Sequence, residues 1–173
     1  MTEQMTAAVL YGKERLQIEV VDVPKIGPGD VLVRVRAALT CGTDVKVFKR
    51  GYHARMIVPP ALFGHELAGD IVAVGSNVKN FKVGQRVMAA NSAPCGNCYY
   101  CQHDQENLCE DLLFNNGAYA EYVKAPANNC YIVPNEVDDY ATTFIEPLTA
   151  CINASRKMNC ELGASVAVIG AGL

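Results

Sequence analysis

The chain has 173 residues, of which 50% are hydrophobic, and its 15 basic and 18 acidic side chains give a formal net charge of −3 at pH 7. This length is typical of roughly one domain, and the hydrophobic content suffices for an ordinary core. The mixed charge argues against nucleic acid as a partner and offers no polybasic patch to a membrane. Because the sequence shows neither a signal peptide nor an apolar run near the roughly 20 residues that span a bilayer, we expect a cytoplasmic protein.

In chain order, the first half is typical of short strands separated by turns. Val31, Val33 and Val35 alternate with more polar neighbours after a turn that contains Pro28 and Gly29. Similar apolar segments between turn residues predict further strands at 70–74, 85–90 and 118–124. We therefore expect a mainly β protein, with a small barrel or sandwich.

Four cysteines lie within fifteen residues, with the spacing of a complete tetrahedral zinc site; they are Cys95, Cys98, Cys101 and Cys109. Such a site has no open position, so it holds a loop and does no chemistry. The alternatives are two disulfides or thiols that pack as small apolar side chains. His103 lies inside the cluster and could replace a cysteine, although a solvated loop position is the simpler interpretation. A reducing compartment, where thiolates remain available to a metal, favours zinc.

The pattern changes after about Pro134. Asp138 or Asp139 is a plausible N-cap for a helix, Pro147 should interrupt that helix and start another, and the second helix should end near Asn159. A buried strand at 166–169 should then run into Gly170-Ala171-Gly172. A strand that leads into G-x-G opens a dinucleotide-binding βαβ unit, but G-A-G alone is a weak signal.

A second group of residues offers a thiolate, an imidazole and a carboxylate on two separate segments: Cys41, His65 and Glu66. Three protein ligands with a free fourth position are what a catalytic zinc requires. The residues alone leave open a buried thiol, a core histidine and a solvated glutamate. Glu146 stands in an apolar stretch before a proline, as either an exposed helix-end residue or a partner of the metal.

Several motifs, in this order and spacing, resemble the zinc-dependent medium-chain dehydrogenase/reductase family of the alcohol dehydrogenase superfamily, close to its sorbitol and threonine dehydrogenase branches. They span nearly the whole chain and are Cys41-Gly42-Thr43-Asp44, Gly64-His65-Glu66-Leu67-Ala68-Gly69, the stretch 75–87, the four-cysteine lobe, 117–122, Glu146-Pro147-Leu148 and 166–172.

The resemblance implies a GroES-like β-barrel catalytic domain at 1–134, with a zinc lobe at about 91–113, followed by the truncated start of a Rossmann domain at 135–173. It implies one structural zinc and one catalytic zinc, the latter held by Cys41, His65 and Glu66. Glu146 then ligates that zinc directly or hydrogen-bonds its water, and the two possibilities stay open. Thr43 takes the substrate proton toward solvent, while Gly170 and Gly172 contribute to cofactor binding.

The implied activity is an NAD(P)-linked dehydrogenase that interconverts a secondary alcohol or polyol and its ketone, in a longer enzyme that forms a homodimer or homotetramer. Two departures stand out: Lys46 occupies a position where many relatives carry a relay histidine, and most of the Rossmann domain is missing. We therefore expect this chain to bind zinc without turnover. A non-catalytic zinc-binding interaction module is the alternative, and a zinc-ribbon nucleic-acid binder fits the acidic balance poorly.

Overall fold

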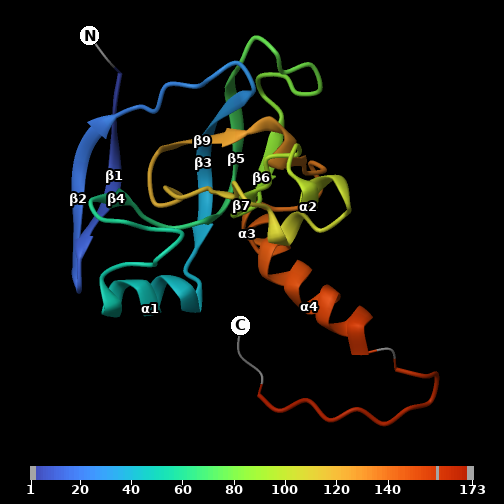
Figure 1. The fold of residues 1–173 in the computed structure, drawn as a ribbon. Coiled ribbons are helices and arrows are strands. Elements are labelled where there is room, and N and C mark those ends of the chain that lie inside the picture. Colours follow the sequence, from blue (N-terminus) through green and yellow to red (C-terminus); the bar gives the residue numbers. More distant parts are fainter. Residues whose placement is uncertain (1–2, 159, 171–173) are drawn as a thin grey trace.

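The protein is described by a computed structural model that covers residues 3–158 and 160–170 and consists mainly of antiparallel strands. A five-stranded sheet has the order β10-β6-β5-β3-β9, a three-stranded sheet has the order β2-β1-β4, and β7 pairs with β8. A bridge between Ala7 and Ala120 joins the two larger sheets, which curl into an incomplete barrel (Figure 1). The predicted mainly β barrel is therefore confirmed.

The strands are β1 (Gln4–Gly12), β2 (Arg15–Asp22), β3 (Asp30–Leu39), β4 (Ala61–Leu62), β5 (Glu66–Val74), β6 (Arg86–Ala89), β7 (Ser92–Ala93), β8 (Leu113–Phe114), β9 (Tyr122–Pro126) and β10 (Cys130–Ile132). The helices are α1 (Gly42–Arg50), α2 (Tyr99–Gln102), α3 (Asp139–Thr143) and α4 (Ile145–Met158), with 3-10 turns η1 (Glu106–Leu108) and η2 (Ala127–Asn129). The segments predicted at 70–74 and 85–90 contribute to β5 and β6. The strand predicted at 118–124 begins later, at Tyr122.

The barrel core fixes how β3 and β5 lie against each other. Val31, Val33 and Ile71 are fully buried on the inner face, as the alternation along β3 predicts. The antiparallel register places Leu39, at the end of β3, opposite Glu66, at the start of β5. Because Cys41 follows Leu39 by two residues, this register brings it to the segment that carries His65 and Glu66.

α1 begins directly after β3, where the sequence alone predicts strands and turns. Cys41 is its N-cap: the sulfur accepts the Thr43 N–H at 3.4 Å, and the Asp44 carboxylate accepts the Cys41 N–H at 3.0 Å. This reciprocal pair is a capping box that satisfies two backbone donors otherwise left free. Gly51, with φ of +98°, then ends the helix in a left-handed conformation that glycine adopts without steric cost.

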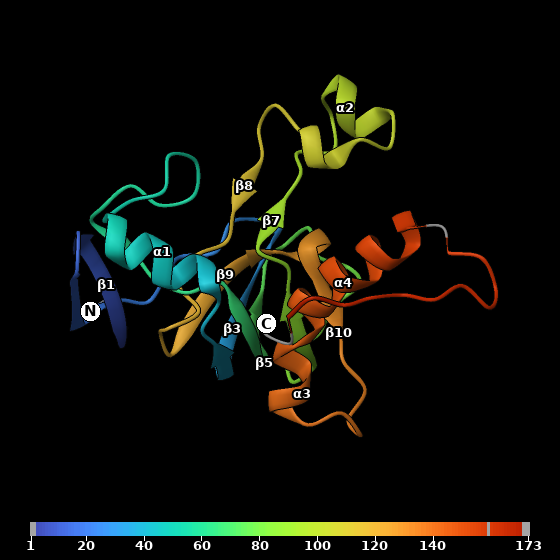
Figure 2. The ribbon, with the colours of Figure 1, turned by 90° about the horizontal axis from the view of Figure 1, so that it is seen from below.

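The C-terminal helices follow the predicted break. Asp138 caps α3 by accepting the Ala141 N–H at 2.9 Å, and the helix packs against β3 and β5 with Thr142 and Thr143 buried. α4 carries Pro147 in its first turn, ends at Met158 and has no buried residue, extending away from the barrel (Figures 1 and 2). Asn159 lies outside the described residues. Among those described, no helix is long and apolar enough to cross a membrane.

The strand predicted at 166–169 is wrong for this structure. The segment is irregular and exposed, with Val168 and Ile169 at 83% and 101% exposure. A strand needs a neighbour to take its backbone N–H and C=O groups, and none of the described strands pairs with this segment. The segment has the apolar composition of a buried strand, but a strand forms only where neighbouring strands can pair with it.

The core position of Ile71 leads to a test of the barrel. Because this side chain of β5 is completely buried in the core cluster, Ile71→Ala should lower the free energy of unfolding by about 2–5 kcal/mol, through lost burial and a cavity. Val83→Ala is the matched control, since Val83 is 62% exposed. Urea unfolding measures both, and equal costs for the two variants would contradict the assignment of Ile71 to the core.

Candidate metal centres

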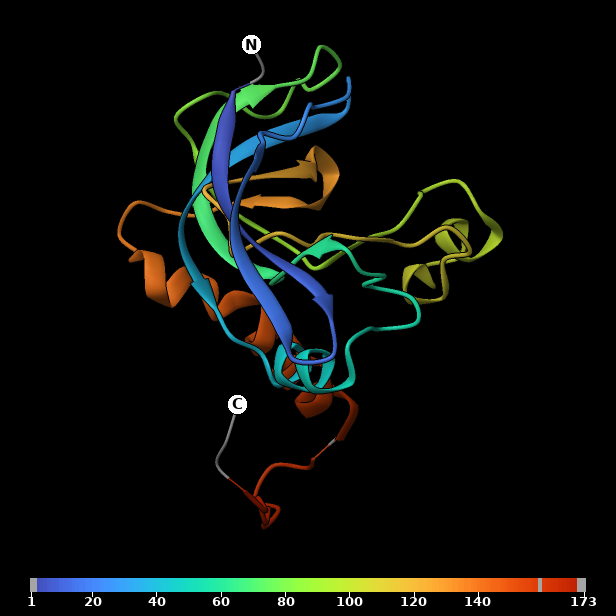
Figure 3. The same cartoon turned by 90° about the vertical axis from the view of Figure 1, so that its left-hand side faces the viewer.

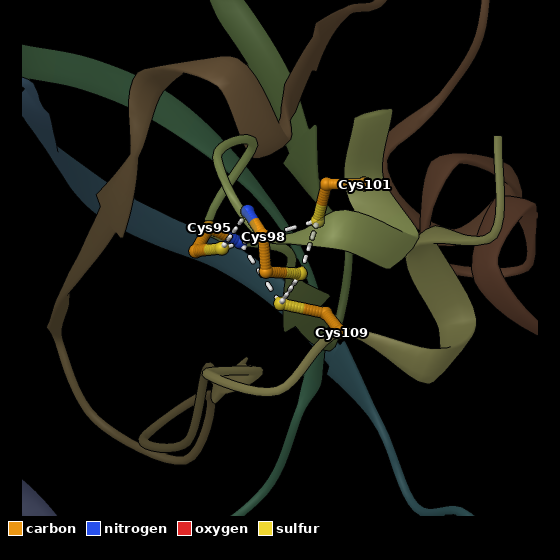
Figure 4. Close-up of side chains that lie close together, drawn as sticks. All are labelled: Cys95, Cys98, Cys101 and Cys109. Atoms are coloured by element: carbon orange, nitrogen blue, oxygen red, sulfur yellow. Dashed lines mark hydrogen bonds between the residues drawn. The ribbon is translucent and has the colours of Figure 1, made fainter. Parts of the chain in front are cut away.

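The four predicted cysteines converge in a lobe between β7 and β8 that projects from the barrel (Figure 3). Their sulfurs lie within 4.8 Å of one another and point to a common centre (Figure 4). The Cys98–Cys101 separation is 3.5 Å, and the Cys95–Cys101 and Cys98–Cys109 separations are 3.9 Å. Four sulfurs at the usual zinc distance from a tetrahedral centre are about 3.8 Å apart, so the donor set fits this ion.

Local backbone geometry prepares these sulfurs for a cation. Gly96 takes φ of +75°, and the N–H groups of Asn97 and Cys98 point to the Cys95 sulfur at 3.4 Å. Backbone N–H groups of Cys101 and Glu110 lower the pKa of Cys98 to about 6, whereas burial and the neighbouring sulfurs raise the pKa of Cys101. A loop whose N–H groups stabilise thiolate charge is suited to a metal that binds thiolates.

The alternative interpretations of this lobe do not fit the geometry. A disulfide needs sulfurs about 2.05 Å apart, and all eight cysteines of the chain are free. Simple apolar packing is also excluded, because only Cys109 of the four is buried. His103 does not replace a cysteine: its Nδ1 hydrogen-bonds the Tyr99 carbonyl at 2.7 Å, and its ring stacks on Tyr99.

The second candidate centre lies where β3, α1 and β5 meet. Cys41, His65 and Glu66 each offer one ligand atom, and these atoms lie within 4.8 Å of one another. His65 and Glu66 are only 3% exposed, and Cys41 is half-buried. The solvated position considered for Glu66 is therefore excluded, and a thiol, an imidazole and a carboxylate share one buried site.

Asp44 orients His65 within this centre. Its Oδ1 lies 3.0 Å from His65 Nδ1, and both side chains are almost fully buried. Burial alone would lower the pKa of His65, but Asp44, with a smaller contribution from Cys41, raises it to about 9. Burial likewise opposes ionisation of Asp44, yet its hydrogen bond with His65 and the charge of His65 keep its pKa below the ordinary value. With Asp44 ionised, Nδ1 is the donor, so Nε2 is the nitrogen left for a metal.

Glu146, in the first turn of α4, interacts electrostatically with Glu66 and His65, although it is not among the residues whose ligand atoms converge within 4.8 Å. Burial raises its pKa, and the charge of Glu66 and a hydrogen bond with Glu66 raise it further, while His65 opposes the rise. When both carboxyl groups are ionised, their negative charges repel each other beside the thiol and the imidazole. A divalent cation bound there would offset this repulsion. The donor chemistry therefore fits zinc.

The remaining predicted residues have different positions. Thr43 is half-buried, and its N–H points to the Cys41 sulfur. Lys46 is exposed on α1, while His53 Nδ1 accepts backbone N–H groups of Arg55 and Met56. Gly170 is exposed with φ of +99°, and Gly172 lies outside the described residues.

Sequence reasoning gave no separate role to Asp44. Its side chain nevertheless links two of the candidate ligands, since it accepts a hydrogen bond from the Cys41 backbone and contacts the His65 ring. The available signal was an acidic residue three positions after Cys41, the spacing of a capping box, although Cys41 is an unusual cap.

The chain folds as a curled β-barrel with a projecting four-cysteine lobe and a buried site that contains a thiol, an imidazole and a carboxylate. These features together define a class of zinc-binding domain, and known proteins of that class are similar to this chain. The chain matches the alcohol dehydrogenase GroES-like domain over residues 27–135. It is 34% identical to sorbitol dehydrogenase of Bacillus subtilis (strain 168) over 98% of this chain and 50% of the relative. It is 38% identical to L-threonine 3-dehydrogenase of Chelativorans sp. (strain BNC1) over 99% of this chain and 52% of the relative.

A solved structure shows the same fold. The alcohol dehydrogenase RspB from Escherichia coli CFT073, complexed with NADH, aligns with a TM-score of 0.80 at 30% identity, covering 89% of this chain and 45% of that one. The chain belongs to the zinc-dependent medium-chain dehydrogenase/reductase family of alcohol dehydrogenases. This confirms the predicted family and GroES-like fold. The chain spans about half the length of the curated relatives described above.

The lobe can be tested by proteolysis. Its described residues form few buried contacts, so its order should depend on the metal rather than on a core. Cys98→Ser should raise the rate of chymotrypsin cleavage after Tyr99, Tyr100 or Leu108 at least tenfold, with the barrel left intact. Cys151→Ser is the control, because Cys151 is an exposed thiol on α4. Unchanged cleavage of the Cys98→Ser variant would show that the lobe is held by something other than its four sulfurs.

The buried pair of His65 and Asp44 predicts a pH dependence of stability in the metal-free chain. His65 has a folded-state pKa of about 9 against an ordinary 6.5, so its contribution is complete below pH 6.5 and is lost as pH rises through 9. The contribution of Asp44, whose pKa is lowered, is present above its ordinary value of 3.8 and disappears as pH falls through its folded-state pKa.

Urea unfolding in the presence of a chelator should therefore show the wild type losing roughly 1–3 kcal/mol relative to His65→Gln between pH 6.5 and 10. Asp44 stays ionised throughout that range, so the change reports His65. Parallel pH curves for the two proteins would contradict the ion pair.

Proposed function

We propose that this chain is the zinc-binding part of a zinc-dependent, NAD(P)-linked oxidoreductase that interconverts a secondary alcohol or polyol and its ketone. The observation that carries the proposal is the convergence of Cys41, His65 and Glu66 in one buried centre, with Glu146 beside it. A structural zinc in the four-cysteine lobe is the second part of the proposal, supported by the sulfur separations.

Zinc in the second centre would be held by the Cys41 sulfur, His65 Nε2 and a Glu66 oxygen, and it would supply a Lewis acid that lowers the pKa of a bound hydroxyl. Glu146 interacts electrostatically with Glu66, and we propose that it either serves as a further ligand or holds a water molecule of the site. Asp44 keeps the His65 ring in the orientation that metal binding requires.

Thr43 is proposed to receive the proton of the substrate hydroxyl and pass it outward. This role is supported by its place in the same capping turn as Cys41 and by its half-buried position. The exposed Lys46 and the backbone-bonded His53 give no support for a histidine relay. In the complete reaction, the alcohol loses one proton and one hydride, and the hydride reduces NAD⁺ or NADP⁺.

The substrate class rests on the relatives. Sorbitol and L-threonine both carry hydroxyl groups on secondary carbons, and the similar proteins from Bacillus subtilis and Chelativorans are named for those compounds. We propose the same class for this protein, in a homodimeric or homotetrameric longer enzyme. A cytoplasmic location is proposed as well, because a reducing compartment keeps the cysteines of both centres available to zinc.

Hydride transfer also requires a nicotinamide held close to the substrate carbon. Gly170 and Gly172 are proposed as contributors to the cofactor site, but residues 164–170 are irregular and exposed in this chain. A pyrophosphate site of this type needs a strand and a helix N-terminus to present the backbone N–H groups. We therefore propose that the chain as given binds zinc and shows no NAD(P)-dependent turnover.

The proposal is tested by counting zinc ions per chain with native mass spectrometry. We expect two in the wild type, one in Cys41→Ala, and two in the Cys151→Ala control, whose thiol is exposed and outside both centres. Assays with sorbitol and L-threonine, each with NAD⁺ and NADP⁺, should show no reduction of the cofactor.

The outcomes separate the competing functions. A single zinc that survives the Cys41→Ala substitution would remove the catalytic centre and favour a non-catalytic zinc-binding module. Measurable turnover that disappears in Cys41→Ala would support the enzyme while contradicting the expected inactivity of this chain.

A further inference from the structure

Tyr119 lies beside the second metal centre, where the segment that carries Cys41 meets the segment that carries His65. It lies in the segment that precedes β9, next to the bridging residue Ala120, and it packs against both buried clusters of the barrel. Its hydroxyl lies 2.9 Å from the Leu39 carbonyl and 3.0 Å from Asp44 Oδ2. Both groups are acceptors that compete for the single hydroxyl proton, and the ionised Asp44 carboxylate is the stronger acceptor. The Tyr119 side chain therefore contacts the end of β3 and the first turn of α1 at the same time.

The contact with Asp44 matters because that carboxylate is buried and each of its oxygens needs hydrogen-bond donors. Asp44 is 2% exposed, and its two oxygens serve different partners. Oδ2 faces the Cys41 N–H and the Tyr119 hydroxyl, each at 3.0 Å, whereas Oδ1 faces His65 Nδ1. Donors fixed on Oδ2 prevent the carboxylate from rotating, and this rotation is what would release the His65 ring.

The ring of Tyr119 packs on the residues that precede His65. Gly64, the residue before His65, has φ of +84°, and a Cβ there would lie 2.6 Å from a ring carbon of Tyr119. Phe63 meets the same ring edge-on, with centroids 5.8 Å apart. The Tyr119 N–H also donates to the Phe63 carbonyl at 3.0 Å. The tyrosine thus packs on the backbone that leads into His65 while its hydroxyl holds the carboxylate that orients the imidazole.

We propose that Tyr119 is a positioning residue of the second metal centre, which holds Asp44 through its hydroxyl and thereby keeps His65 Nδ1–H directed at Asp44 and Nε2 directed at the metal. The orientation of His65 follows from contacts within this chain. The consequence for metal affinity rests on the proposed function. Partners that fix a ligating histidine in this way typically contribute 10–100-fold to metal affinity.

The test compares Tyr119→Phe with Tyr122→Phe. The first substitution removes the hydroxyl and keeps the ring over Gly64. The second removes a hydroxyl three residues along the chain, for which the described residues supply no hydrogen-bond partner, and Tyr122 is half-buried like Tyr119. Urea unfolding of both variants reports any general loss of stability, so that a structural effect can be separated from the effect on His65.

The first readout is the exchange of the His65 Nδ1–H proton with water, measured by NMR on ¹⁵N-histidine-labelled protein. Only three histidines are present, so His53→Gln and His103→Gln variants assign the signals. We expect exchange at least tenfold faster in Tyr119→Phe than in the wild type or Tyr122→Phe. Equal exchange rates in all three proteins would overturn the proposal.

The second readout is the retention of zinc against a chelator, followed by native mass spectrometry. Tyr119→Phe should release the Cys41-dependent zinc at a chelator concentration at least tenfold lower than Tyr122→Phe, while the zinc of the four-cysteine lobe is retained equally. Equal retention of the Cys41-dependent zinc in the two variants would contradict the role in metal binding. If the wild type holds zinc only in the lobe, the proposed function fails, and the exchange rates alone decide whether Tyr119 positions His65.

Discussion

The buried hydrogen bond between Asp44 and His65 is the interaction on which the second centre depends. Ionisable side chains that are almost fully buried are costly unless each finds a partner, and here each supplies the other's. Asp44 also closes the capping turn that begins α1, so one carboxylate serves both a helix terminus and an imidazole. The local fold and the arrangement of the ligands are therefore inseparable at this point.

The features that the sequence predicts well are those written in short-range patterns. Alternation along β3 identifies its buried valines because successive side chains of a strand point to opposite faces. The four-cysteine lobe is predictable for the same reason, since its ligands and turn residues are close neighbours in the chain. The sequence predicts two helices around Pro147, and the break falls at Phe144, three residues earlier, with Pro147 in the first turn of α4, where its missing N–H costs nothing.

The features that sequence reasoning missed depend on contacts between distant positions. Tyr119 and Asp44 are 75 residues apart, and no periodicity relates them. α1 is set by a cap in which a cysteine sulfur replaces the usual oxygen, so the ordinary signals of a helix start are weak. At 166–169 the sequence predicts a strand that the structure lacks. The apolar composition indicates a buried position, but this segment is exposed and the described residues do not cover it.

The four-cysteine lobe has a consequence for how this chain tolerates change. Its loop carries little buried apolar surface of its own, so its shape rests on four side chains and the turn at Gly96 rather than on interlocking volumes. Substitutions between the cysteines therefore meet few steric constraints. In the closely packed barrel core, by contrast, adding or removing a single methylene group changes stability. The lobe and the barrel can diverge at different rates within one polypeptide, which leaves the lobe free to acquire new surface chemistry while the barrel keeps its register.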